Sequence, residues 1–515
     1  MPTVRSSTSA RIRSVAGNEL AALVDLRHLL RFRGGTIRRR TLFVWAVGFL
    51  TLMTAAVAIV PAYLPGAGDS SRATEFSVLI PTAFAGFLAL TIVSSVVSGG
   101  GRELLPRDQA VAFAISPTTD HLGALMLAPL NIAWLLQAWG LLGSMAYAFG
   151  SDTVYASIPV GLLWIATATA VAQAVAWVTE AVRRGPHGIL VVRGLAGSFV
   201  AAALALHFTG NLSSALDRLP TVWFVAGGSL GFSWRWALTL VVLVAMLVAT
   251  VALGAVPAHL AARRLPRDEQ RLESESRPAL PSPRSDLLAL VRTDRASIWR
   301  AVPMRRGMLV LAMGPGIVAV AGDLPWPTMT ILPGLVASGG ALLFGVNIWC
   351  LDGRGSLWRE SLPVSPALVF AARTLVLGEF LLFASAITIA LGSLRAGVPT
   401  PAELTALCCT WVVVTVQVVA AAMRWSDQRP YAVDLRSARA TPAPAVLMVV
   451  YSARLALSTT MTGLVFYFLA NAPDYEASLI AAVPFLCWSL ARMLRTRRAW
   501  TQPVNRARII TTVTV

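Results

Sequence analysis

Long apolar segments alternate with short polar segments along almost the whole chain. A helix that crosses the hydrocarbon core of a bilayer needs about 20 apolar residues. Twelve segments meet or approach this requirement: 42–63, 76–99, 121–148, 157–179, 194–210, 236–260, 308–322, 329–350, 368–393, 403–423, 445–470 and 478–494. Two are weaker, because 308–322 is short and contains Pro315, and 445–470 contains Arg454. The pattern predicts an all-α polytopic membrane protein with about 12 transmembrane helices.

The arginines between these segments predict the orientation of the chain. If both termini are cytoplasmic, the six outer loops hold only Arg72, Arg218, Arg235 and Arg395, and nearly all other arginines fall in cytoplasmic segments. This asymmetry agrees with the positive-inside rule, and the opposite orientation violates it. We therefore expect an even number of spans in a bacterial plasma (inner) membrane, with both termini in the cytoplasm.

Two stretches of the chain, 19–40 and 286–307, align without a gap at a constant offset of 267 residues. In each copy, leucine and valine alternate with charged residues, and the copy leads directly into an apolar segment. A basic amphipathic helix beside a span is typical of the membrane interface. The repeat predicts two pseudo-equivalent six-helix halves, each preceded by an interfacial amphipathic helix.

The repeat also divides the chain into regions. We expect a first transmembrane half over 1–260 with its amphipathic "elbow" helix at 19–37, and an Arg/Pro-rich cytoplasmic linker over 261–285. The second half covers 286–495 with its elbow helix at 286–302. A basic cytoplasmic tail, 496–515, completes the chain.

Composition excludes several functions. The chain is 56% hydrophobic and 13% charged, and its net charge of +18 comes from 43 basic residues that are all arginine. Without lysine, the phosphate-binding loop G-x-x-x-x-G-K-[ST] is impossible, so any ATP hydrolysis requires another chain. The arginines lie between apolar spans, which favours a membrane face over a nucleic-acid partner. Histidine and cysteine show no metal-ligand spacing, and we predict no catalytic residue and no metal in this chain.

A second repeated feature follows the second predicted span of each half. In the first half, Gly101-Arg102-Glu103-Leu104-Leu105-Pro106-Arg107 leads to Ser116-Pro117. In the second half, Asp352-Gly353-Arg354-Gly355-Ser356-Leu357-Trp358-Arg359-Glu360 leads to Ser365-Pro366. Each is a short charged cytoplasmic segment, and each Ser-Pro pair predicts the start of a new helix.

With these features the chain resembles the permeases of ABC-2 type exporters. In those proteins an elbow helix and two spans precede a cytoplasmic coupling helix, and four more spans follow. The resemblance covers the whole chain as two fused halves and implies a non-enzymatic permease that moves an antibiotic, peptide or lipid out of the cell. It implies a cytoplasmic ABC ATPase as partner, in two copies, which carries the ATP and Mg²⁺. The implied contacts with the ATPase are Arg102, Glu103, Arg107, Asp108, Asp352, Arg354, Arg359 and Glu360.

Polar side chains inside the predicted spans are candidates for a substrate pathway, with interhelical hydrogen bonding as the competing interpretation. They are Glu379, Asn131, Asn347, Gln173 and Gln417. Two other functions stay open. A proton-coupled secondary transporter would use Glu379 as its proton carrier, and a membrane enzyme acting on lipid-linked sugars would use Asp69 as catalytic base.

Overall fold

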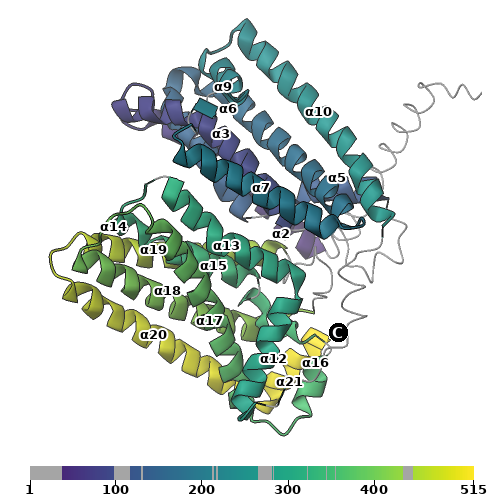
Figure 1. The fold of residues 1–515 in the computed structure, drawn as a ribbon, viewed down its shortest axis with the longest axis vertical. Helices are drawn as coiled ribbons and strands as arrows, with labels where there is room; N and C mark the ends of the chain where they lie inside the picture. The colour runs from purple at the N-terminus through teal and green to yellow at the C-terminus, as the bar shows by residue number, and fades with distance from the viewer. Residues whose placement is uncertain are drawn as a thin grey trace, which may run out of the picture. The chain divides into compact units, whose positions relative to one another are not determined.

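The computed structural model describes residues 37–97, 116–128, 132–211, 214–215, 218–264, 281, 283–321, 323–343, 345–353, 355–432 and 445–514. Within these residues the protein is entirely helical (Figure 1). The expected elbow helix at 19–37 and most of the linker lie outside the described residues. The chain divides into two compact units, Met1–Ser274 and Glu275–Val515.

Seven described helices are long and apolar enough to cross a membrane: Ser71–Val96, Gln137–Arg183, Trp234–Ala262, Trp326–Leu351, Pro366–Gly392, Pro401–Gln428 and Glu476–Thr501. Four predicted spans correspond to shorter apolar helices: Val47–Tyr63, Gly188–Phe199, Gly307–Val320 and Arg454–Ala470. Large apolar side chains such as Val241, Val248, Ile480 and Trp488 are exposed. A soluble protein rarely exposes so much apolar surface. The fold is that of a helical membrane protein, and the count of twelve spans stays a prediction.

The helices of the first unit are α2 (Ile37–Ile59), η1 (Val60–Tyr63), α3 (Ser71–Val97), α5 (Pro117–Leu127), α6 (Ile132–Arg183), α7 (Gly188–Phe208), α9 (Thr221–Ser229) and α10 (Trp234–Ala262). Helix α6 is central and contacts α3 and α10 along its length. The Trp164 ring of α6 stacks on Phe84 of α3 at 5.3 Å and lies 5.5 Å from Phe224 of α9. These aromatic contacts hold the short helix α9 against the core of the unit.

Helix α6 consists of two helices joined at Gly150, whose φ of 63° and ψ of −173° are not helical. After this turn the chain reverses, because Gly161 lies against Leu142 and Met145. The loop between η1 and α3 approaches the turn so closely that a Cβ at Gly150 would lie 3.0 Å from the Cα of Gly68. Glycine is therefore required at both positions of this contact. The turn separates the segments predicted as spans 121–148 and 157–179.

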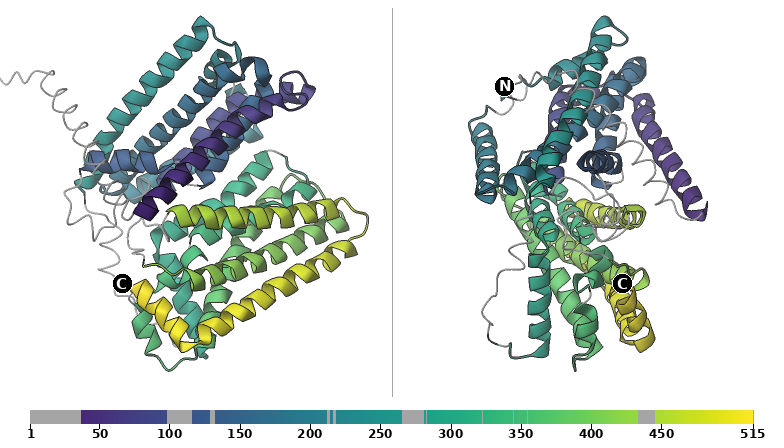
Figure 2. Two further views of the ribbon diagram at one scale, coloured as in Figure 1. Left: turned by 180° about the vertical axis from the view of Figure 1, so that it is seen from behind. Right: turned by 90° about the vertical axis from the view of Figure 1, so that its right-hand side faces the viewer.

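The helices of the second unit are α12 (Asp286–Arg300), α13 (Val302–Ala321), α14 (Trp326–Met329), α15 (Leu332–Leu343), η3 (Gly345–Leu351), α16 (Gly355–Glu360), α17 (Pro366–Gly392), α18 (Pro401–Gln428), α19 (Ala445–Ala470), α20 (Glu476–Thr501) and α21 (Pro503–Thr514). Helix α18 lies between α19 and α20 (Figures 1 and 2). Helix α17 contacts α12, α13 and α15, and the largest buried cluster of the unit lies around it.

Both Ser-Pro signals start a helix, as predicted. Ser116 caps α5 by accepting a hydrogen bond from the Thr119 amide, and Ser365 caps α17 by accepting one from Leu368. Each following proline occupies the first turn, where its missing N–H has no helical partner to lose. The same local chemistry therefore ends the charged segment in both units.

The predicted continuous span 329–350 is interrupted near its end. Helix α15 ends at Leu343, and Asn347 adopts a non-helical conformation inside η3. Side chains satisfy the freed backbone groups. The Ser426 hydroxyl donates to the Gly345 carbonyl at 3.1 Å and accepts from the Ile348 amide at 3.0 Å. Such a break is tolerated at membrane depth only where protein groups replace the lost helical bonds.

Candidate coupling site at residues 352–360

The charged segment that follows η3 forms a short helix held close to the body of the second unit. Gly353, with φ of +48°, lets the chain turn after Asp352, and α16 then spans Gly355–Glu360. The chain continues to Ser365 and enters α17. The segment is therefore fixed at both ends, by η3 on one side and by a capped helix on the other.

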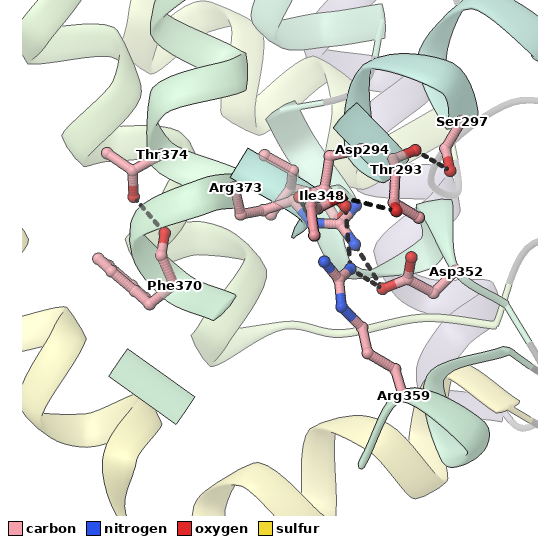
Figure 3. Close-up of polar contacts among 10 residues, drawn as sticks. Thr293, Asp294, Ser297, Ile348, Asp352, Arg359, Phe370, Arg373 and Thr374 are labelled. Carbon is pink, nitrogen blue, oxygen red and sulfur yellow. Dashed lines mark hydrogen bonds and ion pairs between the residues drawn. The ribbon is translucent and has the colours of Figure 1, made fainter. Parts of the chain in front are cut away.

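Two charged side chains of this segment contact one charged side chain from α12 and one from α17 (Figure 3). Arg373 of α17 forms ion pairs with Asp352 and, at 3.2 Å, with Asp294 of α12. Arg359 of α16 approaches the same two carboxylates, at 2.9 Å in each case. We call Asp294, Asp352, Arg359 and Arg373 the charge cluster. It joins α12, α16 and α17.

The four charged side chains are largely buried, so each of them needs a partner of opposite charge. Asp294 and Arg373 have no exposed side-chain area, and Arg359 and Asp352 are 10% and 13% exposed. Two arginines and two aspartates give no net charge, so each buried ion has a partner of opposite sign. Removing a single partner leaves an uncompensated buried charge, which costs about 3–5 kcal/mol.

The pKa of Asp352 reflects the same balance. Burial raises the pKa of this carboxyl, but the charges and hydrogen bonds of Arg373 and Arg359 outweigh burial and bring it below its ordinary value. The carboxylate therefore stays ionised at every physiological pH. Its ion pairs do not switch within the physiological pH range.

A stack of tryptophans connects the segment to the C-terminal helices. The rings of Trp349 and Trp500 lie 3.7 Å apart and are parallel to within 2°. The Trp500 indole donates to the Pro366 carbonyl at 3.0 Å, at the start of α17. The Arg373 guanidinium lies on the ring of Trp349, 5.9 Å from its centroid. The aromatic stack thus covers one side of the charge cluster.

Helix α21 completes this region. Ile509, Ile510 and Val513 are buried, and Arg506 forms an ion pair with Glu360 of α16 at 2.6 Å. A cavity of about 150 Å³ lies among α16, α17 and α21. The sequence predicted residues 496–515 only as a basic tail. In the structure α20 extends to Thr501 and Pro503–Thr514 form α21 against α16, whereas a cytoplasmic location of this tail stays a prediction.

One face of α16 points away from the unit. Leu357 and Trp358 are 56% and 68% exposed. Their neighbour Arg359 is held in the charge cluster. The helix therefore presents two large apolar side chains outward while it is anchored by a buried charge.

The structure brings three of the predicted coupling residues together: Asp352, Arg359 and Glu360. Arg354 and the four first-half residues Arg102, Glu103, Arg107 and Asp108 lie outside the described residues. Their role stays a prediction.

The predicted pathway residues do not form one group in the described structure. Glu379 is 47% exposed and pairs with Arg295 of α12 at 2.7 Å. Asn347 is buried and donates to the Tyr431 carbonyl at 2.9 Å. Gln417 accepts a hydrogen bond from Thr462 at 3.1 Å, and Gln173 is buried in the first unit. Asn131 lies outside the described residues, and a pathway role for any of the five stays a prediction.

The residues of this site that the sequence did not identify are Asp294, Arg373, Trp500 and Arg506. The sequence holds one signal that could have identified Asp294. At the repeat offset of 267 its equivalent is Arg27, so the charge at this position is reversed between the two copies. At the offset of 249 that relates Ser116 to Ser365, Ala124 is the equivalent of Arg373. Two of the four cluster residues, Asp294 and Arg373, therefore have no like-charged counterpart at these offsets in the first half.

The described residues offer no site for a metal ion, since they contain no group of three or more His, Cys, Asp or Glu side chains placed to hold one. Comparison with protein-family models, with curated proteins and with solved structures found no match. The case for a function therefore depends on the residues and their geometry.

Proposed function

We propose that this chain is the membrane permease of an ATP-driven exporter. A separate cytoplasmic ABC ATPase, in two copies, binds and hydrolyses ATP with Mg²⁺ and docks on the segment 352–360 and its first-half equivalent. The exported substrate is amphipathic or hydrophobic, such as an antibiotic, a peptide or a lipid. The protein lies in a bacterial plasma membrane with both termini in the cytoplasm.

The charge cluster is the observation that carries this proposal. A docking helix transmits force only if it cannot move independently of the membrane helices. Arg359 anchors α16 to Asp294 of α12, and Arg373 anchors both to α17. A displacement of α16 by a partner therefore moves the elbow helix and a membrane helix as one body, as alternating access requires.

The exposed face of α16 supports the same function. Leu357 and Trp358 are large apolar residues on a short helix beside charged Glu360. Exposed aromatic and aliphatic anchors next to polar groups are typical of protein–protein contacts. In the predicted orientation this segment is cytoplasmic, where a soluble ATPase could cover the two exposed side chains.

Co-purification with candidate ABC ATPases from the same organism tests the proposal. We expect a stable complex in which the permease alters the rate of ATP hydrolysis. The variant L357A/W358A leaves the charge cluster intact and removes the exposed anchors. We expect it to weaken association at least about tenfold, because anchor residues of this kind contribute about 2 kcal/mol or more.

The matched control is L394A/V398A, which removes two apolar side chains that are 70% and 95% exposed in a predicted outer loop. It should leave the complex unchanged. If no ATPase associates under any nucleotide condition, the exporter function is wrong. If L357A/W358A binds as tightly as the control, an exporter remains tenable but α16 is not its docking helix.

A further inference from the structure

A second cavity of the second unit, of about 200 Å³, lies among α18, α19 and α20. It is separate from the charge cluster. It is lined by Gln417, Ala421, Trp425, Tyr451, Arg454, Leu455, Ser458, Trp488, Ser489 and Arg492. Its volume exceeds that of a single water several-fold. None of the ten lining residues carries a carboxylate.

The charges around this cavity are all positive. Arg492 of α20 interacts electrostatically with Arg454 of α19 and with Arg424 of α18. Within the described part of the chain, none of the three arginines forms an ion pair. Arg424 and Arg454 are exposed and Arg492 is half-buried, so these like charges repel one another in part, and an anion bound among them would relieve the repulsion.

Hydrogen-bond donors in the cavity wall also lack partners. The Tyr451 hydroxyl, the Trp425 indole N–H and the Nε of Arg492 are buried and make no hydrogen bond among the described residues. Tyr451 is 1% and Trp425 is 7% exposed. A buried donor without an acceptor costs about 1–3 kcal/mol. Together with the nearby arginines, these three donors could bind an anionic group that carries several acceptor oxygens.

We propose that this cavity binds a phosphate-bearing anion, and that the anion is the phosphodiester headgroup of an acidic phospholipid. Arginine and neutral N–H and O–H donors match phosphate oxygens in charge and geometry. The opening favours the lipid as the source. Arg454 and Trp488 are exposed at the rim, and other large apolar side chains of α20, such as Leu490 and Leu494, are exposed as well.

The depth of the cavity agrees with a headgroup. Arg492 precedes Trp500 by eight residues on α20, which corresponds to about 12 Å along the helix axis. Trp500 stacks beside the charge cluster, at the level of the predicted cytoplasmic segment. Arg492 therefore lies just inside the membrane from that level, where basic pockets between helices hold lipid headgroups.

Lipid binding to the purified permease, without its ATPase, tests this proposal and keeps it separate from the proposed function. The probes are nanodiscs of phosphatidylcholine with or without phosphatidylglycerol, and inorganic phosphate in detergent. Native mass spectrometry counts the phospholipids retained after delipidation, and the shift in thermal unfolding reports ligand affinity. We expect wild-type protein to retain phosphatidylglycerol and to be stabilised by it.

The variant R454Q/R492Q should bind phosphatidylglycerol at least about tenfold more weakly, because charge-assisted hydrogen bonds are lost. The control R497Q/R498Q removes two exposed arginines from α20 and should stay within about twofold of wild type. Tyr451→Phe keeps the ring in the core and removes only the hydroxyl. It therefore tests anion binding even if the double variant fails to fold. We expect a several-fold loss for it.

The outcomes distinguish the two sources of phosphate. Retention of phosphatidylglycerol that millimolar phosphate does not displace identifies a lipid headgroup. Stabilisation by inorganic phosphate alone supports the anion site but assigns it to a soluble phosphate. If neither probe distinguishes R454Q/R492Q or Tyr451→Phe from the control, the anion site is wrong.

Discussion

Arg373 of α17 and Asp294 of α12 form an ion pair, with 3.2 Å between Nε and Oδ2, although neither side chain is exposed. The two residues are 79 positions apart in sequence, so the pair fixes the amphipathic helix to a membrane helix. With Asp352 and Arg359 it forms a neutral cluster in the interior of the unit. The cluster connects α12, α16 and α17 through buried ion pairs.

Replacing Arg373 with methionine should destabilise the protein by about 3–5 kcal/mol, since it leaves buried carboxylates without a counter-charge. The matched control is Arg395→Met, because Arg395 pairs with an exposed Asp323 at 3.3 Å. Its cost should be at most about 1 kcal/mol. The free energy of unfolding in mixed micelles measures both. In the double variant D294N/R373M the losses should not add, and additive losses would contradict direct coupling.

Asp352 predicts a specific dependence on pH. Its folded-state pKa lies below the ordinary value of 3.8, so its ion pairs contribute stability that is fully present above that value. The contribution is lost only as the pH falls through the lower, folded-state pKa. The difference in unfolding midpoint between wild type and Asp352→Asn should stay constant from pH 7 to about pH 5 and shrink below about pH 4. A difference that disappears near pH 5 would contradict the strong pairing.

Helix α21 should stabilise the candidate coupling site. Ile509 has no exposed area, so Ile509→Ala should cost about 2–5 kcal/mol through lost contacts and a cavity. Val504 on the same helix is 85% exposed, and Val504→Ala should change stability by less than about 0.5 kcal/mol. Protease sensitivity of residues 352–365 measures the local effect. Equal sensitivity in the two variants would mean that α21 does not support α16.

Much of the helical layout follows from sequence because it depends on local signals. Apolar length placed the long helices, and Ser365-Pro366 placed the start of α17 at the correct residue. The break at Asn347 was not predictable from the apolar run, because it depends on Ser426 of a distant helix. A contact between residues far apart in the sequence produces no periodic pattern of apolar and polar positions, so the sequence alone does not predict it.

The candidate site was predictable only in part for the same reason. The repeat and the charges identified Asp352, Arg359 and Glu360 as a segment, but not the buried partners that hold it. Residue counting placed Glu379 well inside the span 368–393. Its pairing with Arg295 depends on how α12 crosses α17, and the sequence of either helix alone does not specify this.

The pairing of Glu379 with Arg295 gives a test between the exporter and a proton-coupled transporter. The pair is about half exposed on both sides, so it contributes at most about 1 kcal/mol to stability. If the permease is driven by its ATPase, Glu379→Gln should retain full stimulation of ATP hydrolysis and an unchanged unfolding midpoint. Arg295→Gln is the matched control, because it breaks the same ion pair without removing the carboxylate. A proton carrier requires the opposite result: Glu379→Gln abolishes pH-driven substrate uptake into vesicles while Arg295→Gln does not.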